Sequence, residues 1–452
     1  MRHNMGGINA DHILDIDRKL AELTPVPFER CIFRVHDRLR NENKKAYEPE
    51  VVAIGPYHHG KDNLQPMEEH KLRYLKWLLH RRNETSAERY IVEMQKSEQR
   101  AREFYAEPIN SLDSNAFVEM MLLDSCFILE FLRNMANLED PNNEMTSLED
   151  PNDEMANLQD PINEMTNPMA DLIDLEWYIG YALRRDLLLF ENQLPFFIVK
   201  QLFDMTKTEN PTDSLDNLIG EFVSHFRWIT PEPSKFLPGD INHLLGLLHY
   251  CCCNKFHLMV SRSDRVKIED KSLKSATELL EAGIKFKKIE GSNLFDIRFE
   301  NGTMKIPTLQ VEDHTESVFR NLIAYEQYHP DTSWHHFTAY HKLMDYLVNT
   351  SKDVKILTDD GIIRSLLGEN EVVATMLNKL GNNIMVSYKG YEKVYNNVNE
   401  HCKRKWNLSL ATLRRDYFNT PWAFISFVAA VVLLVFTVLQ TIFSIHPVGK
   451  SN

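Results

Sequence analysis

Apolar and polar side chains follow a helical period over most of the chain. Residues 67–79, MEEHKLRYLKWLL, place five apolar side chains on one face, which predicts an amphipathic helix that buries this face. The face consists of Met67, Leu72, Leu75, Leu78 and Leu79. Residues 115–133, NAFVEMMLLDSCFILEFLR, are apolar nearly all round and predict a buried helix.

A polar triplet interrupts the apolar segment DLLLFENQLPFFIVKQLF, residues 186–203. Glu191, Asn192 and Gln193 separate two apolar runs, and Pro195 follows them. Because proline suits the first turn of a helix, Pro195 is predicted to start a new helix. The polar triplet is predicted to cap the break between the two helices.

The period changes to two in LFDIRFENGTMKIPTLQV, residues 294–311. Apolar and charged residues alternate over 295–300, and Asn301-Gly302 predicts a hairpin turn. Pro307 favours a position on the edge of the sheet. The predicted fold class is mainly α: a large helical domain with a small antiparallel β-hairpin element, plus one C-terminal transmembrane helix.

The last apolar segment predicts that transmembrane helix because it holds no charged side chain. As a helix, the residues from Trp422 to Ile445 would measure roughly 36 Å, enough to cross a hydrocarbon core of about 30 Å. Pro421 suits the first helical position, and Trp422 suits the headgroup level. We predict a transmembrane helix over residues 421–446, followed by a short exposed tail, 447–452.

The flanking charges predict the orientation of this helix. Lys450 is the one base after it, whereas five precede it: Lys403, Arg404, Lys405, Arg414 and Arg415. Basic flanks stay on the cytosolic side, and the N-terminal sequence lacks the apolar core of a signal peptide. The prediction is a single-pass membrane protein with a C-terminal anchor and a cytosolic body. Both the plasma membrane and internal membranes are open as its location.

A tandem repeat interrupts the body of the chain. NLEDPNNEMT, SLEDPNDEMA and NLQDPINEMT are three copies of a ten-residue unit at 137–166, with nine acids and no Lys or Arg. A proline in every unit blocks a continuous helix, and this acidic, polar composition is typical of disorder. The predicted organisation is an N-terminal tail (1–27), a helical domain (28–420) that carries this insertion (137–167), and the anchor.

Composition excludes several classes of function. The net charge is −14, from 51 bases and 65 acids, which argues against nucleic acid as a partner. Six cysteines, three of them consecutive, predict neither a disulfide scaffold nor a CxxC site. The sequence also lacks the GxGxxG, GxxxxGK[ST], GxSxG and HExxH patterns. No cofactor and no metal are predicted.

Histidine pairs are the remaining candidates for chemistry. They lie in GPYHHG, residues 55–60, and in WHHFTAYH, residues 334–341. Adjacent histidines point in different directions, so one metal rarely binds both. The default interpretation is that the ring nitrogens are hydrogen-bonded to backbone groups. One alternative is a metal site, assembled from both histidine clusters or from the cysteine triplet with His249 and His257. Another alternative is an enzyme that uses His58 or His59 with Glu68 or Glu69.

Several segments resemble the plant family known as domain of unknown function 247. They are EPEVVAIGPYHHGKDNLQPMEEHKLRYLKWLL, DSCFILEFL, DLLLFENQLPFFIVKQLF, ATELLEAGIKFKK, FDIRFENGTMKIPTLQVEDHTESVFRNLIAYEQYH and PWAFISFVAAVVLLVFTVLQ. The resemblance runs from about Phe28 to Ile445, with VAIGPYHHG in place of a commoner Ser-Ile-Gly form. It implies a plant protein with a helical domain, a single C-terminal membrane segment and no established enzymatic activity. Some members of the family are encoded at self-incompatibility loci of grasses.

The leading hypothesis is therefore a membrane-anchored, non-enzymatic recognition or signalling protein. Its sharpest form is a pollen-side determinant of self-incompatibility, with the bilayer and an unidentified protein as partners. The alternatives are an enzyme that uses the GPYHHG histidines and a scaffold that recruits cytosolic partners to a membrane. The motif residues without an assigned role are Gly55, Pro56, Tyr57, His58, His59, Gly60, Glu191, Asn192, Gln193 and Pro195.

Overall fold

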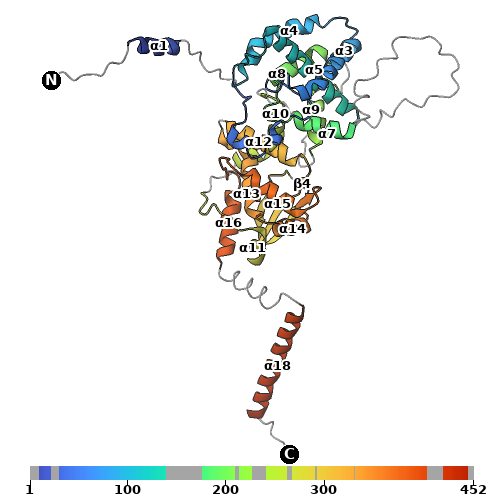
Figure 1. The fold of residues 1–452 in the computed structure, drawn as a ribbon. Coiled ribbons are helices and arrows are strands. Elements are labelled where there is room, and N and C mark those ends of the chain that lie inside the picture. Colours follow the sequence, from blue (N-terminus) through green and yellow to red (C-terminus); the bar gives the residue numbers. More distant parts are fainter. Residues whose placement is uncertain are drawn as a thin grey trace, which may run out of the picture.

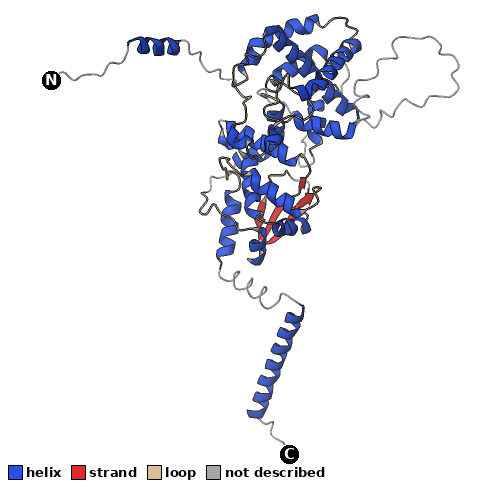
Figure 2. Ribbon diagram, viewed as in Figure 1, coloured by secondary structure: helices blue, strands red, loops and turns tan. Residues whose placement is uncertain are grey.

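Helices make up most of the part of the chain that the structure describes, and the strands described lie in one region of it (Figure 2). The computed structural model describes residues 10–21, 30–138, 176–208, 213–226, 241–261, 267–290, 293–329, 331–404 and 421–445. Within these residues, the mainly helical part of the predicted fold class and its small β element are confirmed, whereas the predicted transmembrane helix is not. The ten-residue repeats lie outside the described residues, apart from the two residues that end helix α5.

The first half of the body is helical in the part that the structure describes. It comprises α2 (Asp37–Arg40), η1 (Lys44–Tyr47), η2 (Asp62–Leu64), α3 (Gln65–Arg81), α4 (Glu88–Glu103), α5 (Ser114–Leu138), α7 (Glu176–Asp186), α8 (Phe196–Thr206) and α9 (Leu215–Ser224), where η marks a short 3-10 helix. Helix α5 contacts α3, α4, α8 and α9, and Figure 1 shows these helices gathered around it. Every residue from Met120 to Arg133 is buried, which confirms the prediction of a buried helix.

The second half adds further helices and all the described strands. Its helices are α10 (Leu244–Ser261), α11 (Ala276–Glu281), α12 (Thr315–Tyr328), η4 (Thr332–Trp334), α13 (His336–Leu347), α14 (Ser351–Asp359), α15 (Asn370–Leu380) and α16 (Glu392–Lys403). Local chemistry explains where two of them begin, because Ser275 with Glu278 and Thr350 with Asp353 form capping boxes at α11 and α14. Helix α12 contacts η1 of the first half as well as α10, α13 and α15, so it joins the two halves.

Two small sheets lie beside α11 and α14. The strands are β1 (Lys285–Ile289), β2 (Arg298–Glu300), β3 (Thr303–Pro307), β4 (Leu309–Val311) and β5 (Ile363–Ser365). Strands β2 and β3 form the predicted antiparallel hairpin, with positive φ at both turn residues, Asn301 (51°) and Gly302 (73°). Strand β1 pairs in parallel with the other edge of β3, and β4 pairs in parallel with β5. The sequence pattern did not indicate these parallel pairings.

The predicted edge position of Pro307 is wrong. Strand β3 is the central strand of the order β1-β3-β2, and Pro307 is its last residue. Strand β2 pairs only with residues 303–305 of β3. The missing N–H of Pro307 therefore removes no hydrogen bond to β2, and a proline is tolerated in a central strand because it stands at the strand's end.

The buried face of α3 also differs from the predicted one. Met67, Leu75 and Leu78 are buried as expected, but Leu72 is 52% exposed. Lys71 and Tyr74 complete the buried face instead. Their positions fit the helical period. Because lysine counts as polar in a hydrophobicity pattern, the pattern placed the neighbouring Leu72 on the buried face in place of Lys71.

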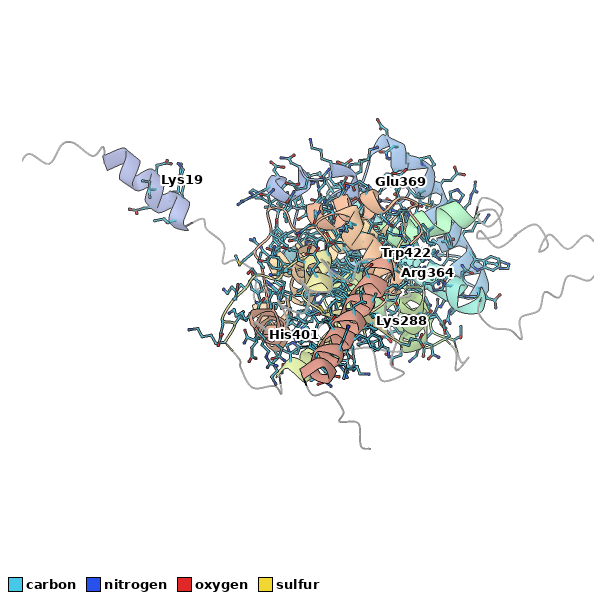
Figure 3. All side chains as sticks on the ribbon, turned by 90° about the horizontal axis from the view of Figure 1, so that it is seen from below. Lys19, Lys288, Arg364, Glu369, His401 and Trp422 are labelled. Carbon is cyan, nitrogen blue, oxygen red and sulfur yellow. The ribbon has the colours of Figure 1, made fainter. Side chains whose placement is uncertain are left out.

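Two helices lie apart from the body, α1 (Ala10–Ala21) and α18 (Pro421–Ile445) (Figure 1). The described side chains of α18 are those of Trp422 and residues 425–441. Among the described residues, no helix combines the length and apolarity that crossing a membrane requires. The end of the body viewed in Figure 3 carries charges of both signs, including Lys288, Arg364 and Glu369.

Candidate functional site

The GPYHHG motif ends an extended segment that is held by side chains from distant parts of the chain. Asp186, the last residue of α7, accepts hydrogen bonds from the backbone N–H groups of residues 50, 51 and 52 at 2.9, 2.7 and 3.1 Å. Asn192 Oδ1 accepts from the N–H of Ile54 (2.7 Å), and Asn192 Nδ2 donates to the carbonyl of Val52 (2.9 Å). These side chains satisfy backbone groups that a neighbouring strand would otherwise satisfy.

A buried ion pair holds the same segment from the other side. Lys71 Nζ donates to Asp124 Oδ1 (2.6 Å), to the carbonyl of Ala53 (2.6 Å) and to Glu68 Oε1 (2.7 Å). Asp124 Oδ2 accepts from the N–H of Gly55 at 2.7 Å. Burial alone would lower the pKa of Lys71, but the two carboxylates outweigh burial and raise it. The lysine therefore stays charged and ties α3, α5 and the motif together.

The two predicted motifs touch at Gly55. This residue has a φ of 72°, and a Cβ placed on it would lie 2.4 Å from the carbonyl oxygen of Gln193. The same carbonyl accepts a hydrogen bond from Tyr105 Oη at 3.1 Å. Only glycine fits here, because both the backbone angle and the close approach exclude a side chain.

The polar triplet binds both the break between the helices and distant segments. As predicted, it caps the end of α7: Asn192 Nδ2 donates to the carbonyl of Asp186, and Gln193 Nε2 donates to that of Leu187. Glu191 Oε1 accepts from the N–H of Val35, and its Oε2 forms an ion pair with Arg40. Gln193 Oε1 accepts from the N–H of Leu245 at 3.1 Å. Helix α8 begins at Phe196, directly after Pro195, and has no side-chain cap. The triplet thus connects the chain between α7 and α8 to three other regions.

His58 is buried beside Glu191, whereas His59 is partly exposed. His58 Nε2 lies 3.7 Å from Glu191 Oε2, and neither ring nitrogen of His58 has a hydrogen-bond partner among the described residues. Burial lowers the pKa of His58 to about 3, helped by the nearby cations Lys61, Arg40 and Arg34. The imidazole is therefore neutral at physiological pH.

The carboxylates predicted to partner these histidines are bound elsewhere. Glu68 pairs with Lys71, and Glu69 pairs with Arg73. Glu191 is the carboxylate near His58, and its own charge is paired with Arg40. Tyr57 packs against Arg34, whose Cζ lies 4.4 Å from the ring centre, and donates to the carbonyl of Ile32 at 3.3 Å. The motif residues mainly hold backbone and neighbouring side chains in place.

One group of three potential metal ligands occurs within the described residues: His249, Cys253 and Glu326. The group includes none of the histidines of GPYHHG or WHHFTAYH, but it brings together His249 and Cys253 of the alternative that combined the cysteine triplet with His249 and His257. Glu326 accepts from His249 Nε2 (2.8 Å) and from the N–H groups of Phe337 and Thr338 (both 2.8 Å). Its carboxylate therefore satisfies the first N–H groups of α13, and this arrangement is complete without an ion.

The other candidate histidines and cysteines are mostly core residues. His335, His336 and His341 are buried, and burial lowers the pKa of His336 to about 2 and that of His341 to about 4. Cys252 and Cys253 are buried too, and burial raises the pKa of both thiols well above the usual value. These thiols are protonated and act as small apolar side chains.

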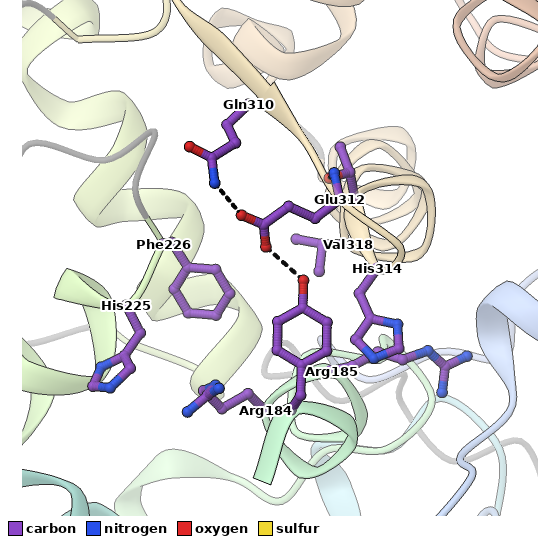
Figure 4. A pocket seen from close by; sticks show the side chains of 10 residues that line it. Arg184, Arg185, His225, Phe226, Gln310, Glu312, His314 and Val318 are labelled. Carbon is purple, nitrogen blue, oxygen red and sulfur yellow. Dashed lines mark hydrogen bonds between the residues drawn. The ribbon is translucent and has the colours of Figure 1, made fainter. Parts of the chain in front are cut away.

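A polar pocket lies where α7, the end of α9, β4 and the start of α12 meet (Figure 4). It has a volume of about 70 Å³. Arg184, His225, Gln310 and His314 are among its lining residues. The sequence pattern gave no sign of this site, because its residues come from four elements that are distant in the chain. Lys71 and Asp124 were missed as well, although a charge within an apolar helix face was a signal for both.

A helical body braced by two buried polar motifs matches the family expected from the sequence. The match to DUF247, a family of plant proteins of unknown function, covers residues 32–436. The chain belongs to this family.

Two curated relatives come from Arabidopsis thaliana. The chain is 28% identical to the UPF0481 protein At3g47200 over an alignment length of 448, which covers 91% of this chain and 85% of that protein. It is 21% identical to the putative UPF0481 protein At3g02645 over an alignment length of 531, which covers 96% of this chain and 93% of that protein. No solved structure matches. These relatives support the assignment to a family whose function is unknown.

Proposed function

We propose that this protein is a membrane-anchored, non-enzymatic recognition or signalling protein, with α18 as the anchor and the helical body as the part that binds a partner. The braced motifs support the second half of this proposal. Asp186, Asn192 and the Lys71–Asp124 pair all bind backbone of the segment 50–55. Because these polar side chains are hydrogen-bonded to backbone, they hold the segment in one conformation. A surface of fixed conformation is what recognition of a partner requires.

The exposed apolar surface of helix α18 is the observation that supports the anchor, although no described helix meets the length and apolarity expected of a membrane span. Helix α18 runs over 25 residues, about 37 Å at 1.5 Å per residue. Its large apolar side chains are exposed, among them Trp422 (77%), Leu433 (66%) and Leu434 (66%). A contiguous exposed apolar surface of this size is unfavourable in water and is typical of a membrane or protein contact.

The charges around α18 support a cytosolic body. Helix α16 ends in Lys403, and four more bases of the sequence, at 404, 405, 414 and 415, precede α18. A basic flank is retained on the cytosolic side of a membrane. The partner of a cytosolic body would be a cytosolic or internalised protein, because an extracellular ligand cannot reach it directly.

Charged substitutions in α18 test the anchor. Leu434→Arg with Val435→Arg places two charges near the middle of the helix, at a cost of about 3 kcal/mol each in a bilayer. Leu366→Arg with Val372→Arg is a matched control, because these side chains are exposed on the body (62% and 48%). In carbonate-washed membranes, the unmodified chain and the control should stay in the pellet, and the α18 variant should be released. Release of the unmodified chain, or identical behaviour of both variants, would refute the anchor.

Two further experiments test the orientation and the partner. Protease added to intact vesicles should digest the body, and a shielded body would overturn the cytosolic orientation. The finer form of the proposal is a pollen-side determinant of self-recognition, so affinity purification from native membranes should recover a partner that differs between self and non-self combinations. A constant set of cytosolic proteins would instead favour a membrane scaffold.

A further inference from the structure

The pocket between α7, α9, β4 and α12 differs from the braced motifs in that part of its lining is not committed to other groups. Its acidic group is committed: Glu312 accepts from Tyr181 Oη at 2.5 Å and also from Gln310 Nε2. Arg185 is committed as well, since it pairs with Asp186 at 2.7 Å and donates to the carbonyls of Lys45 and Glu48.

Arg184 is the exception. It is half-buried, and its Cζ lies 5.7 Å from the centre of the Tyr181 ring. No ion pair joins Arg184 to a carboxylate within the described part of the chain, and Figure 4 shows its guanidinium among the lining groups, toward His225. Burial lowers the pKa of Arg184, and the charge of Glu312 opposes this effect without cancelling it.

The surroundings of Arg184 favour a small ligand. The pocket volume of about 70 Å³ is well below the roughly 300–1,000 Å³ of sites for drug-sized molecules. Phe226, Tyr181 and His314 supply ring surfaces, and Tyr181 stacks on His314 with the ring centres 4.5 Å apart. Gln310 Nε2 donates one N–H to Glu312 and keeps a second that can bond to an oxygen-rich group, whereas His225 Nδ1 is bonded to the carbonyl of Glu221.

We propose that this pocket binds a small oxyanion, a carboxylate or a phosphate group, and that Arg184 is its principal ligand. The planar guanidinium donates two parallel hydrogen bonds to such groups, which a lysine cannot reproduce. The bound anion neutralises a half-buried charge that forms no ion pair within the described residues. Because the pocket joins α7 and α9 to β4 and α12, its occupant also bridges the two halves of the body.

Titration of the full-length protein in detergent with sodium phosphate and with sodium acetate, each against sodium chloride of equal ionic strength, tests this proposal. Saturable heat in a calorimeter is expected for at least one of the two anions. Tighter binding of phosphate identifies a phosphate group as the ligand, and tighter binding of acetate identifies a carboxylate. Absence of saturable binding for both anions overturns the proposal.

Variants assign the binding to Arg184. Arg184→Gln should weaken binding at least tenfold and should raise the melting temperature of the anion-free protein, because it removes a half-buried charge that forms no ion pair within the described residues. Arg184→Lys keeps the charge but loses the two parallel N–H donors of the guanidinium, so it should bind the anion with intermediate affinity. Arg364→Gln, at an exposed position on β5, is the matched control and should change neither quantity. Binding that survives Arg184→Gln, or is lost equally in Arg364→Gln, contradicts the assignment.

Discussion

Replacing Gly55 with alanine tests how closely the two buried motifs approach each other. The substitution has two costs in this structure. The first is the backbone angle, because an L-residue at a φ of 72° loses roughly 1–2 kcal/mol in the left-handed region. The second is the clash of the new Cβ, which would lie 2.4 Å from the carbonyl oxygen of Gln193. Relieving such overpacking typically costs about 1–3 kcal/mol more.

Gly60 supplies a matched control in the same motif. It has a φ of 78°, and nothing lies within 4 Å of a Cβ placed on it. Gly60→Ala therefore has the cost of the backbone angle alone, roughly 1–2 kcal/mol. Gly55→Ala is expected to lose about 2–5 kcal/mol of the free energy of unfolding in total.

Urea denaturation of the full-length protein in detergent, followed by tryptophan fluorescence, measures both variants against the unmodified chain. The midpoint for Gly55→Ala should fall clearly below that for Gly60→Ala, with an unchanged slope. Equal midpoints for the two variants would show that a Cβ at residue 55 does not lie as close as 2.4 Å to the carbonyl oxygen of Gln193. The reasoning about the braced segment would then fail.

Two further predictions use the same assay. Lys71→Met should lose about 3–5 kcal/mol because it leaves the Asp124 charge buried without a cation, whereas Lys76→Met, at an exposed position of α3, should change stability by less than about 0.5 kcal/mol. Adding Asp124→Asn to Lys71→Met should restore part of the loss, and a double variant no better than the single one would contradict the ion pair. The second prediction concerns His58, whose pKa of about 3 in the folded protein lies below the ordinary value near 6.5. The unfolded chain gains a proton that the folded protein resists, so stability falls as the pH drops below about 6.5, by up to about 1.4 kcal/mol per pH unit for this group. His58→Gln should make the decline between pH 7 and about pH 5 shallower by that amount, and an unchanged pH slope would refute the role of burial.

Local pattern was sufficient for much of the secondary structure. The apolar run of α5, the helical period of α3 and the Asn301-Gly302 turn are each encoded by neighbouring residues. Such features depend on side-chain spacing within one or two turns of backbone, so they can be read along the chain. The motif residues were also recognisable by sequence, but the role of each was not.

The partners of those residues depend on how the chain reverses and packs. Asn192 binds the N–H of Ile54, 138 residues away, and the triplet that caps α7 also binds three remote segments. The sequence alone predicts a solvent-exposed Lys71, and only the packing of α5 places Asp124 next to it. The parallel strands and the lining of the Arg184 pocket likewise depend on contacts between segments that are distant in the sequence.

The sequence by itself determined the helical class of the body, the hairpin and the uncharged terminal segment, because each of these follows from residues adjacent along the chain. Only the tertiary structure decided that a lysine is buried, that a histidine is neutral and that an arginine forms no ion pair within the described residues. Charge and burial of an ionisable group depend on what surrounds it in space, and those surroundings come from elements that are far apart in the sequence.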